Sequence, residues 1–114
     1  MKKIAILTCL KANKVCTGAA CFKAYNEKKD FFARYQNLPL ELVAFAKCNG
    51  CQSDLATDRD LQSKLERLIK IGTEVVHLGV CTKNKATGIE CAKITAIAER
   101  LQQANIEVVR GCHL

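Results

Sequence analysis

The sequence predicts an α/β fold built on a small, doubly wound, mostly parallel sheet of four strands. Four short apolar runs suited to buried strands alternate with segments whose apolar residues recur at helical spacing. Strands that alternate with single helices imply right-handed crossovers and parallel pairing. A chain of 114 residues suits one hydrophobic core. Because common doubly wound sheets have more than four strands, we expect a truncated flavodoxin-like arrangement.

The first half of the chain predicts a strand, a helix and a second strand. Residues 3–7 are apolar enough for a buried strand. Helix-forming residues run from 19 to about 26 and on toward Tyr35, and Thr17 is the expected N-cap. After a turn, residues 40–46 form a second apolar run, which predicts the second strand.

A helix is expected next, because Thr57 and Asp60 resemble a capping box. Gly72 is placed to end this helix as the residue after its C-cap. The apolar residues that recur at helical spacing between these points are Leu61, Leu65, Leu68 and Ile69.

The last part of the chain predicts a strand over residues 74–80, a helix, and a fourth strand over residues 106–109. Thr87 and Glu90 have the spacing of a capping box, so we expect the helix to open there. Its expected buried stripe consists of Ile94, Ile97, Ala98 and Leu101.

Composition and hydropathy are those of an ordinary globular chain, with 49% hydrophobic residues and a mean hydropathy near zero. No run approaches the roughly 18 apolar residues that span a bilayer, and the apolar run near Met1 is too short for a signal peptide. We therefore expect a cytoplasmic protein with no membrane partner, whose thiols are kept reduced.

Cysteines follow the carboxyl ends of all four predicted strands. Cys9, Cys48 and Cys81 come just after the first three strands, and Cys112 follows the last. The carboxyl ends of parallel strands share one edge of the sheet, which is where open α/β sheets bind ligands. The remaining cysteines lie in loops or first helical turns at this same edge, namely Cys16, Cys21, Cys51 and Cys91.

The motif Cys48-Asn49-Gly50-Cys51 suits two kinds of chemistry. A two-residue spacer lets both sulfurs reach one tetrahedral metal, and the same spacing serves thiol–disulfide exchange. A redox pair needs two sulfurs, whereas this chain has eight cysteines. The surplus favours a metal site of four thiolates, which zinc and iron–sulfur clusters both accept.

The first-choice metal ligands are the cysteines of this motif and those after the neighbouring strands: Cys9, Cys48, Cys51 and Cys81. A possible second set consists of Cys16, Cys21, Cys91, Cys112 and His113. His77 lies four residues before Cys81 in a predicted strand, so their Cα atoms would be about 13 Å apart at about 3.3 Å per residue. The alternative function is a thiol–disulfide oxidoreductase that uses Cys48 and Cys51 and meets a redox partner protein.

The net charge of +7 permits an anionic partner, but several lysines lie within a few residues of a cysteine. Cations at such positions stabilise thiolates. With two Tyr and no Trp for base stacking, we do not expect a nucleic-acid partner. The edge strands of an open sheet could be covered by a second copy of the chain.

Missing motifs argue against one class of enzyme and against nucleotide binding. Phosphatase or arsenate-reductase chemistry after the first strand needs an arginine six residues beyond the cysteine, and position 15 is Val15. The chain also lacks a G-x-G-x-x-G or Walker A pattern, so nucleotide binding has no support.

The order of motifs resembles that of the CGGC domain family over nearly the whole chain. The motifs are Cys9, Cys16-Thr17-Gly18 to Cys21, residues 40–45 leading into Cys48-Asn49-Gly50-Cys51, and Val76-His77-Leu78 before Cys81. The resemblance implies one CGGC-like domain over residues 1–114 and metal binding through cysteines and histidines. Asn49 stands where the central motif has its first glycine, and Cys112 stands where the terminal Gly-Thr-His motif has threonine.

Overall fold

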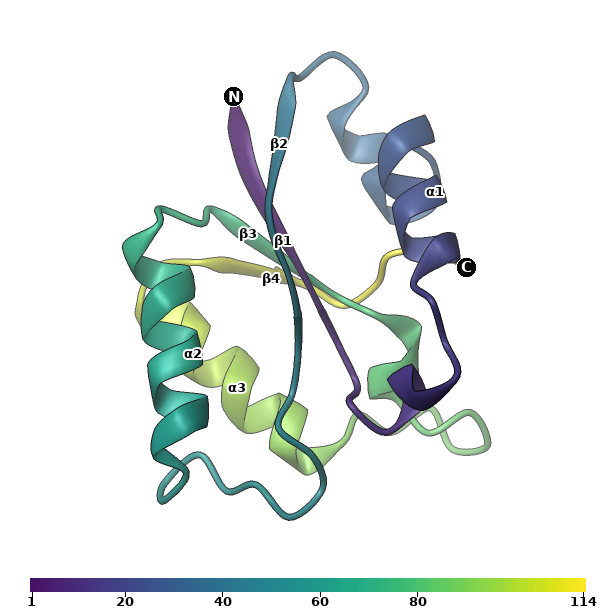
Figure 1. Ribbon diagram of the computed structural model, residues 1–114. Coiled ribbons are helices and arrows are strands. Elements are labelled where there is room, and N and C mark those ends of the chain that lie inside the picture. The colour runs from purple at the N-terminus through teal and green to yellow at the C-terminus, as the bar shows by residue number, and fades with distance from the viewer.

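Four parallel strands form a single sheet in the computed structural model, which describes residues 1–114 (Figure 1). The strand order is β2-β1-β3-β4, and every neighbouring pair is parallel. This confirms the predicted α/β fold and its small parallel sheet. The strands are β1 (Lys2–Thr8), β2 (Leu40–Lys47), β3 (Val75–Leu78) and β4 (Glu107–Val109).

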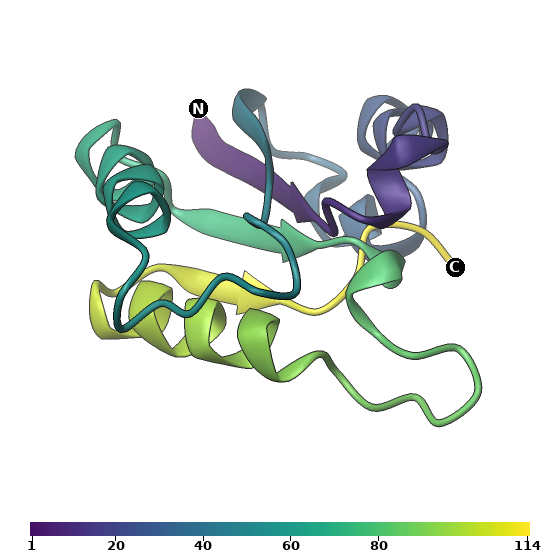
Figure 2. The same ribbon diagram turned by 60° about the horizontal axis from the view of Figure 1, so that its bottom comes forward.

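Helices cover both faces of this sheet (Figure 2). From β1 the chain crosses one face to the edge strand β2, and it then returns over the other face to β3 and β4. Right-handed crossovers in opposite directions place their helices on opposite faces. The helices are α1 (Ala19–Glu27), α2 (Arg59–Lys70) and α3 (Ala92–Gln103), with short 3₁₀ helices η1 (Ala12–Lys14), η2 (Asp30–Tyr35) and η3 (Val80–Thr82).

The alternation of side chains along β1 divides the core into two clusters. Ile4 and Ile6 pack toward α1 and η2, whereas Ala5 and Leu7 pack toward α2 and α3. The helical stripes predicted from the sequence face this second cluster. Leu61, Leu65 and Leu68 of α2 and all four stripe residues of α3 are buried, and Ile69 is partly buried. Full burial of one such side chain contributes about 1.5–3 kcal/mol.

The helix starts differ from the predicted caps. Gly18, with φ of +79°, precedes α1, and the Thr17 hydroxyl accepts a bond from the Ala19 N–H but does not cap the helix. A bulkier residue is disfavoured at this position, since a Cβ on Gly18 would lie 2.9 Å from the Phe45 ring. At α2 the cap is Asp58, whose carboxylate accepts the N–H groups of two following residues.

The segment before α3 is a loop and not the first turn of a helix. The predicted capping box at Thr87 and Glu90 was wrong, because Glu90 forms an antiparallel bridge with Lys83 and α3 begins after Cys91. This loop projects from the body of the protein (Figure 2). The third strand is also shorter than predicted, because residues 80–82 turn into η3. Gly72 follows α2 with φ of +83°, as predicted for its end.

The strand order reverses between β1 and β3. The loop after β1 leads toward α1 on one face, and the loop after β3 leads toward α3 on the other. Loops that diverge in this way leave a crevice at the carboxyl ends of the strands. Cys9 follows β1 and Cys81 follows β3, so both lie at this crevice. None of the helices has the length and apolar character that crossing a bilayer would require.

Candidate functional site

Five of the eight cysteines line one small cavity at the carboxyl edge of the sheet. They come from three loops, which follow β1, β2 and β3. The cavity has a volume of about 30 Å³, which is on the scale of a single water molecule or ion. We call this group the thiol cavity, and its cysteines are Cys9, Cys48, Cys51, Cys81 and Cys91.

Two backbone amides point at sulfurs of the thiol cavity. The N–H of Cys9 donates to Sγ of Cys81 at 3.3 Å, across the point where the strand order reverses. The N–H of Leu10 donates to Sγ of Cys48, also at 3.3 Å. Hydrogen bonds to sulfur favour its negatively charged form. The loop after β1 is thus joined to both neighbouring loops through their sulfurs.

Two lysines line the thiol cavity, and burial governs the protonation of Cys81. Lys11 and Lys93 line the cavity with the cysteines, as the clustering of lysines near cysteines suggested. Their positive charge favours thiolates. Burial raises the pKa of Cys81 above its ordinary value, and the amide bond from Cys9 only partly offsets this effect. Cys81 therefore stays a thiol at neutral pH unless a metal displaces its proton.

The two cysteines of the C-x-x-C motif differ in accessibility. Cys48 is buried with 7% of its surface exposed, whereas Cys51 is exposed. Gly50 between them adopts φ of +101°, a conformation that glycine permits at no steric cost. The base of this loop is fixed by Lys64 of α2, whose Nζ donates to the Lys47 carbonyl at 2.6 Å. The same Nζ also donates to the side-chain oxygen of Asn49.

The thiol cavity has the donors of a metal site, but they are not drawn together around one point. In this structure, no three Cys, His, Asp or Glu side chains are placed so that they could hold a metal ion. Cys51 and Cys91 are the two exposed members. Closure on a metal would therefore require the loop that carries Cys51, the segment before α3, or both to move inward.

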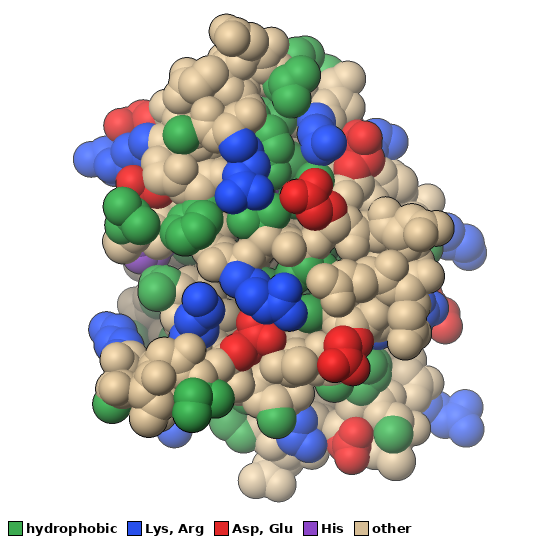
Figure 3. Space-filling model, turned by 180° about the vertical axis from the view of Figure 1, so that it is seen from behind, with side chains coloured by type: hydrophobic (Ala, Val, Ile, Leu, Met, Phe, Trp, Pro, Cys, Tyr) green, Lys and Arg blue, Asp and Glu red, His purple; other side chains and the backbone are tan.

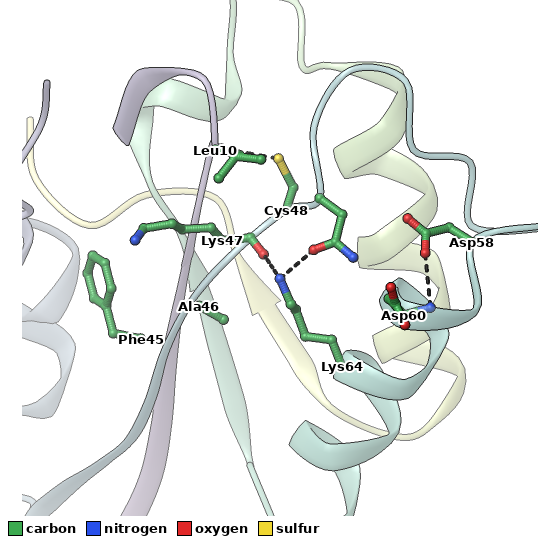
Figure 4. A pocket seen from close by; sticks show the side chains of 9 residues that line it. Leu10, Phe45, Ala46, Lys47, Cys48, Asp58, Asp60 and Lys64 are labelled. Carbon is green, nitrogen blue, oxygen red and sulfur yellow. Dashed lines mark hydrogen bonds between the residues drawn. The ribbon is translucent and has the colours of Figure 1, made fainter. Parts of the chain in front are cut away.

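A larger groove adjoins the thiol cavity at Cys48 (Figure 4). Its volume is about 780 Å³, and it lies between the open edge of β2 and the first turns of α2. Three consecutive residues, 45–47, line it, which shows that it follows the strand edge and not one face of the sheet. Cys48 therefore stands between an open groove and an enclosed cluster of thiols.

The structure separates the second set of predicted ligands from the first. Cys91 joins the thiol cavity, whereas Cys21 and Cys112 face each other in the core beneath α1. We call these two the thiol pair. Cys16 is exposed, and its Sγ accepts a bond from the Gly18 N–H at 3.3 Å. His113 is partly exposed at the chain end.

A buried hydrogen-bond chain beside the thiol pair was not anticipated from the sequence. His77 is fully buried, with Nδ1 at 2.7 Å from the Gly111 carbonyl and Nε2 at 2.8 Å from the Tyr35 hydroxyl. The carbonyl can only accept, so Nδ1 carries the proton and Tyr35 donates to Nε2. The Phe32 ring stacks on the imidazole with centroids 4.2 Å apart. Burial lowers the pKa of His77 to about 4, so it is neutral at physiological pH.

Charged side chains of both signs are interspersed on the face of the molecule seen in Figure 3. The excess of Lys and Arg does not gather there into one continuous basic surface. Near the cysteines, Lys11 and Lys93 line the thiol cavity and Lys64 lines the groove.

These features define a cysteine-rich α/β protein whose thiols gather at the carboxyl edge of a parallel sheet. The chain belongs to the CGGC domain family, whose model matches residues 3–113. It is also similar to the uncharacterized protein MJ0582 of Methanocaldococcus jannaschii, with 34% identity over 120 residues that cover 97% of this chain and 86% of the relative. No solved structure matches the chain.

Proposed function

We propose that the chain binds a thiophilic metal through Cys9, Cys48, Cys51 and Cys81. The observation that carries this proposal is the convergence of thiols from three separate loops on one cavity. Cysteines that serve only as small apolar residues have no reason to share one cavity with lysines. Cys91 lies at the same cavity and is the reserve ligand.

The cavity's size favours a single ion over a cluster. Zinc takes four thiolates at about 2.3 Å, and a volume of about 30 Å³ is on the scale of one ion. An iron–sulfur cluster also takes four thiolates, but it adds several iron and sulfide atoms to the space between them. We therefore propose zinc as the metal, with an iron–sulfur cluster as the outcome that the absorption spectrum would reveal.

The chain's own residues would prepare the thiolates for the metal. The amides of Cys9 and Leu10 donate to two of the sulfurs, and Lys11 and Lys93 supply positive charge that offsets an excess of thiolates. A bound zinc would fix the loops after β1, β2 and β3 to one another. Because a metal must displace the proton of Cys81, apparent metal affinity should rise with pH.

Metal analysis of protein purified without oxygen tests the proposal. Stoichiometric zinc in a colourless protein is the expected result. A brown protein with absorption near 400 nm would mean an iron–sulfur cluster in place of zinc. Metal-free protein that also fails to take up added zinc or iron with sulfide would overturn metal binding altogether.

Thiol–disulfide exchange through Cys48 and Cys51 is the second candidate, favoured by the difference in exposure within the motif. Cys51 is exposed and could attack a disulfide, whereas buried Cys48 could resolve the mixed disulfide. The groove that meets Cys48 would receive the partner. Reduction of an added disulfide substrate by metal-free protein, lost in both Cys51→Ser and Cys48→Ser but not in Cys16→Ser, would support this function.

A further inference from the structure

The thiol pair is built from two distant parts of the chain. Cys21 is in the first turn of α1, and Cys112 follows β4 near the chain end. Their side chains lie near each other in the core cluster on the α1 side of the sheet, close enough for each thiol to shift the pKa of the other. Cys21 is 5% exposed and Cys112 is fully buried. The fold itself, and not a local motif, therefore brings these two sulfurs together.

The segment that carries Cys112 is fixed from several sides. The buried His77 donates to the Gly111 carbonyl at 2.7 Å, and the Phe31 N–H donates to the Cys112 carbonyl at 3.3 Å. The Phe31 ring packs so closely on Gly111 that a Cβ there would lie 2.4 Å from it. These contacts with β3 and η2 fix the segment of Cys112, which shares a core cluster with Cys21 of α1.

We propose that Cys21 and Cys112 form a dithiol that a peroxide oxidises to an intramolecular disulfide. In the first step the Cys21 thiolate attacks one oxygen of hydrogen peroxide, the O–O bond breaks, and hydroxide leaves to be protonated to water. In the second step the Cys112 sulfur attacks the Cys21 sulfenic acid, the S–O bond breaks, and a second water leaves with the Cys112 proton. The two sulfurs lose two electrons in total, and the peroxide gains them.

Accessibility decides which sulfur reacts first and with what. Cys112 has no exposed surface, so Cys21 must meet the oxidant, and its small exposed fraction favours a molecule as small as a peroxide over a bulky disulfide. The electrostatics agree with this order. The neighbouring Cys112 thiol lowers the pKa of Cys21 to about 7, despite its burial, and the charge of His113 acts in the same direction. The neighbouring Cys21, together with burial, raises the pKa of Cys112.

The proposed disulfide uses two sulfurs that are not among the ligands proposed for the metal of the thiol cavity, although Cys81 is close enough to raise the pKa of Cys112. Neither Cys21 nor Cys112 lines that cavity, and both belong to the core cluster on the opposite face of the sheet from Cys48. Oxidation would tie α1 covalently to the segment after β4. The thiol cavity could keep its metal in either state of the thiol pair.

Peptide mapping after peroxide treatment tests the proposal. Reduced protein, with and without added zinc, is treated with hydrogen peroxide, alkylated to block free thiols, digested with trypsin and analysed by mass spectrometry. Trypsin should release residues 15–23, which contain both Cys16 and Cys21, and residues 111–114, which contain Cys112. The Cys16→Ser variant serves as the matched control, because it leaves Cys21 as the sole cysteine of its peptide.

The expected result is a cross-link between these two peptides in wild type and in Cys16→Ser, whether or not zinc is present. In Cys112→Thr the cross-link should be lost and Cys21 should proceed to its sulfinic acid, because no thiol remains to resolve the sulfenic acid. Unmodified Cys21 and Cys112 in wild type, under conditions that oxidise cysteines elsewhere, would overturn the proposal. A peptide in which Cys21 pairs with Cys16 and leaves Cys112 free would overturn it as well.

Discussion

The thiol cavity lies at the carboxyl edge of the sheet and the thiol pair lies in the core on the α1 side, and the chain holds them in different ways. Cys51 and Cys91 of the cavity are exposed on loops, and no three of the cavity's side chains lie close enough together to hold a metal ion. Cys21 and Cys112 of the pair are buried near each other in one core cluster. A set of donors that must close on a ligand needs mobile loops, whereas a pair that reacts internally needs fixed geometry. This difference favours metal binding at the cavity and disulfide formation at the pair.

Serine substitutions in the two regions should separate their functions most strongly. Cys48→Ser and Cys81→Ser should each lose most of the metal, since the fourth thiolate of the tetrahedral site would then have to come from the exposed reserve ligand Cys91. Cys112→Thr should retain full metal content, because Cys112 does not line the cavity. Metal analysis of the purified variants measures this, with circular dichroism to confirm the fold. Metal loss in Cys112→Thr would mean that the two regions form one site.

The pH dependence of stability should come mainly from the side of the thiol pair. The pKa of His77 is lowered to about 4, whereas an unfolded histidine titrates near 6.5. The imidazole is neutral in both the folded and the unfolded protein above pH 6.5, so its titration does not lower the free energy of unfolding there. As the pH falls from 6.5 to 4, His77 binds a proton in the unfolded protein but stays neutral in the folded protein. The free energy of unfolding therefore falls by about 3 kcal/mol.

Urea unfolding at pH 7 and pH 4.5 measures this loss. His77→Gln cannot titrate and should lose less stability between the two pH values than wild type, whatever its stability at pH 7. Equal losses in wild type and variant would show that His77 does not control the acid side of the stability profile.

Two glycines next to the two thiol regions should respond differently to alanine. A Cβ on Gly111 would lie 2.4 Å from the Phe31 ring, so Gly111→Ala should cost about 1–3 kcal/mol and shift Cys112 away from Cys21. A Cβ on Gly79 meets looser contacts, 3.1 Å from Thr8 and 3.2 Å from Sγ of Cys81. Gly79→Ala should therefore cost less and leave the peroxide cross-link intact. Unfolding midpoints and peptide maps of both variants check this order.

The smallest expected effect concerns the hydroxyl at the end of the buried hydrogen-bond chain. Tyr35→Phe keeps the ring but removes the donor to Nε2 of His77, which leaves a buried acceptor unpaired. The expected cost is about 1 kcal/mol, from one lost buried hydrogen bond. Urea unfolding at pH 7 measures it, and metal content should not change. A metal content that falls in Tyr35→Phe would show that the two faces of the sheet are coupled.

The sheet and its core could be predicted from the sequence because hydrophobic period reports directly on burial. The stripe of α3, from Ile94 to Leu101, was identified correctly even though the start of the helix was not. Its start failed because the turn chemistry of Thr87 and Glu90 serves equally well in the loop, where Glu90 bridges to Lys83. A local capping motif in the sequence does not determine which tertiary contacts its residues will make.

The sequence predicted the part of the candidate site that follows from sheet topology alone, namely which cysteines lie at the carboxyl edge. Parallel strands bring the residues after their carboxyl ends to one edge, and Cys9, Cys48 and Cys81 meet there at one cavity. The sequence predicted Cys112 at the same edge, in the second set of ligands, because it also follows a strand. In the structure, however, β4 is the far edge of the sheet, and its loop turns toward α1 and not toward the crevice. Only the three-dimensional path of the chain end separates the two groups.

The bond from Lys64 to the Lys47 carbonyl has a consequence for how molecules of this protein meet. β2 is an edge strand, and open backbone groups on such strands are templates for pairing with another chain. The Lys47 carbonyl lies on that open side, because the following amide, that of Cys48, already bonds inward to Thr8. By occupying this carbonyl with a charged group, Lys64 interrupts the row of acceptors beside the groove. The side chain that steadies the base of the C-x-x-C loop also discourages two sheets from joining edge to edge.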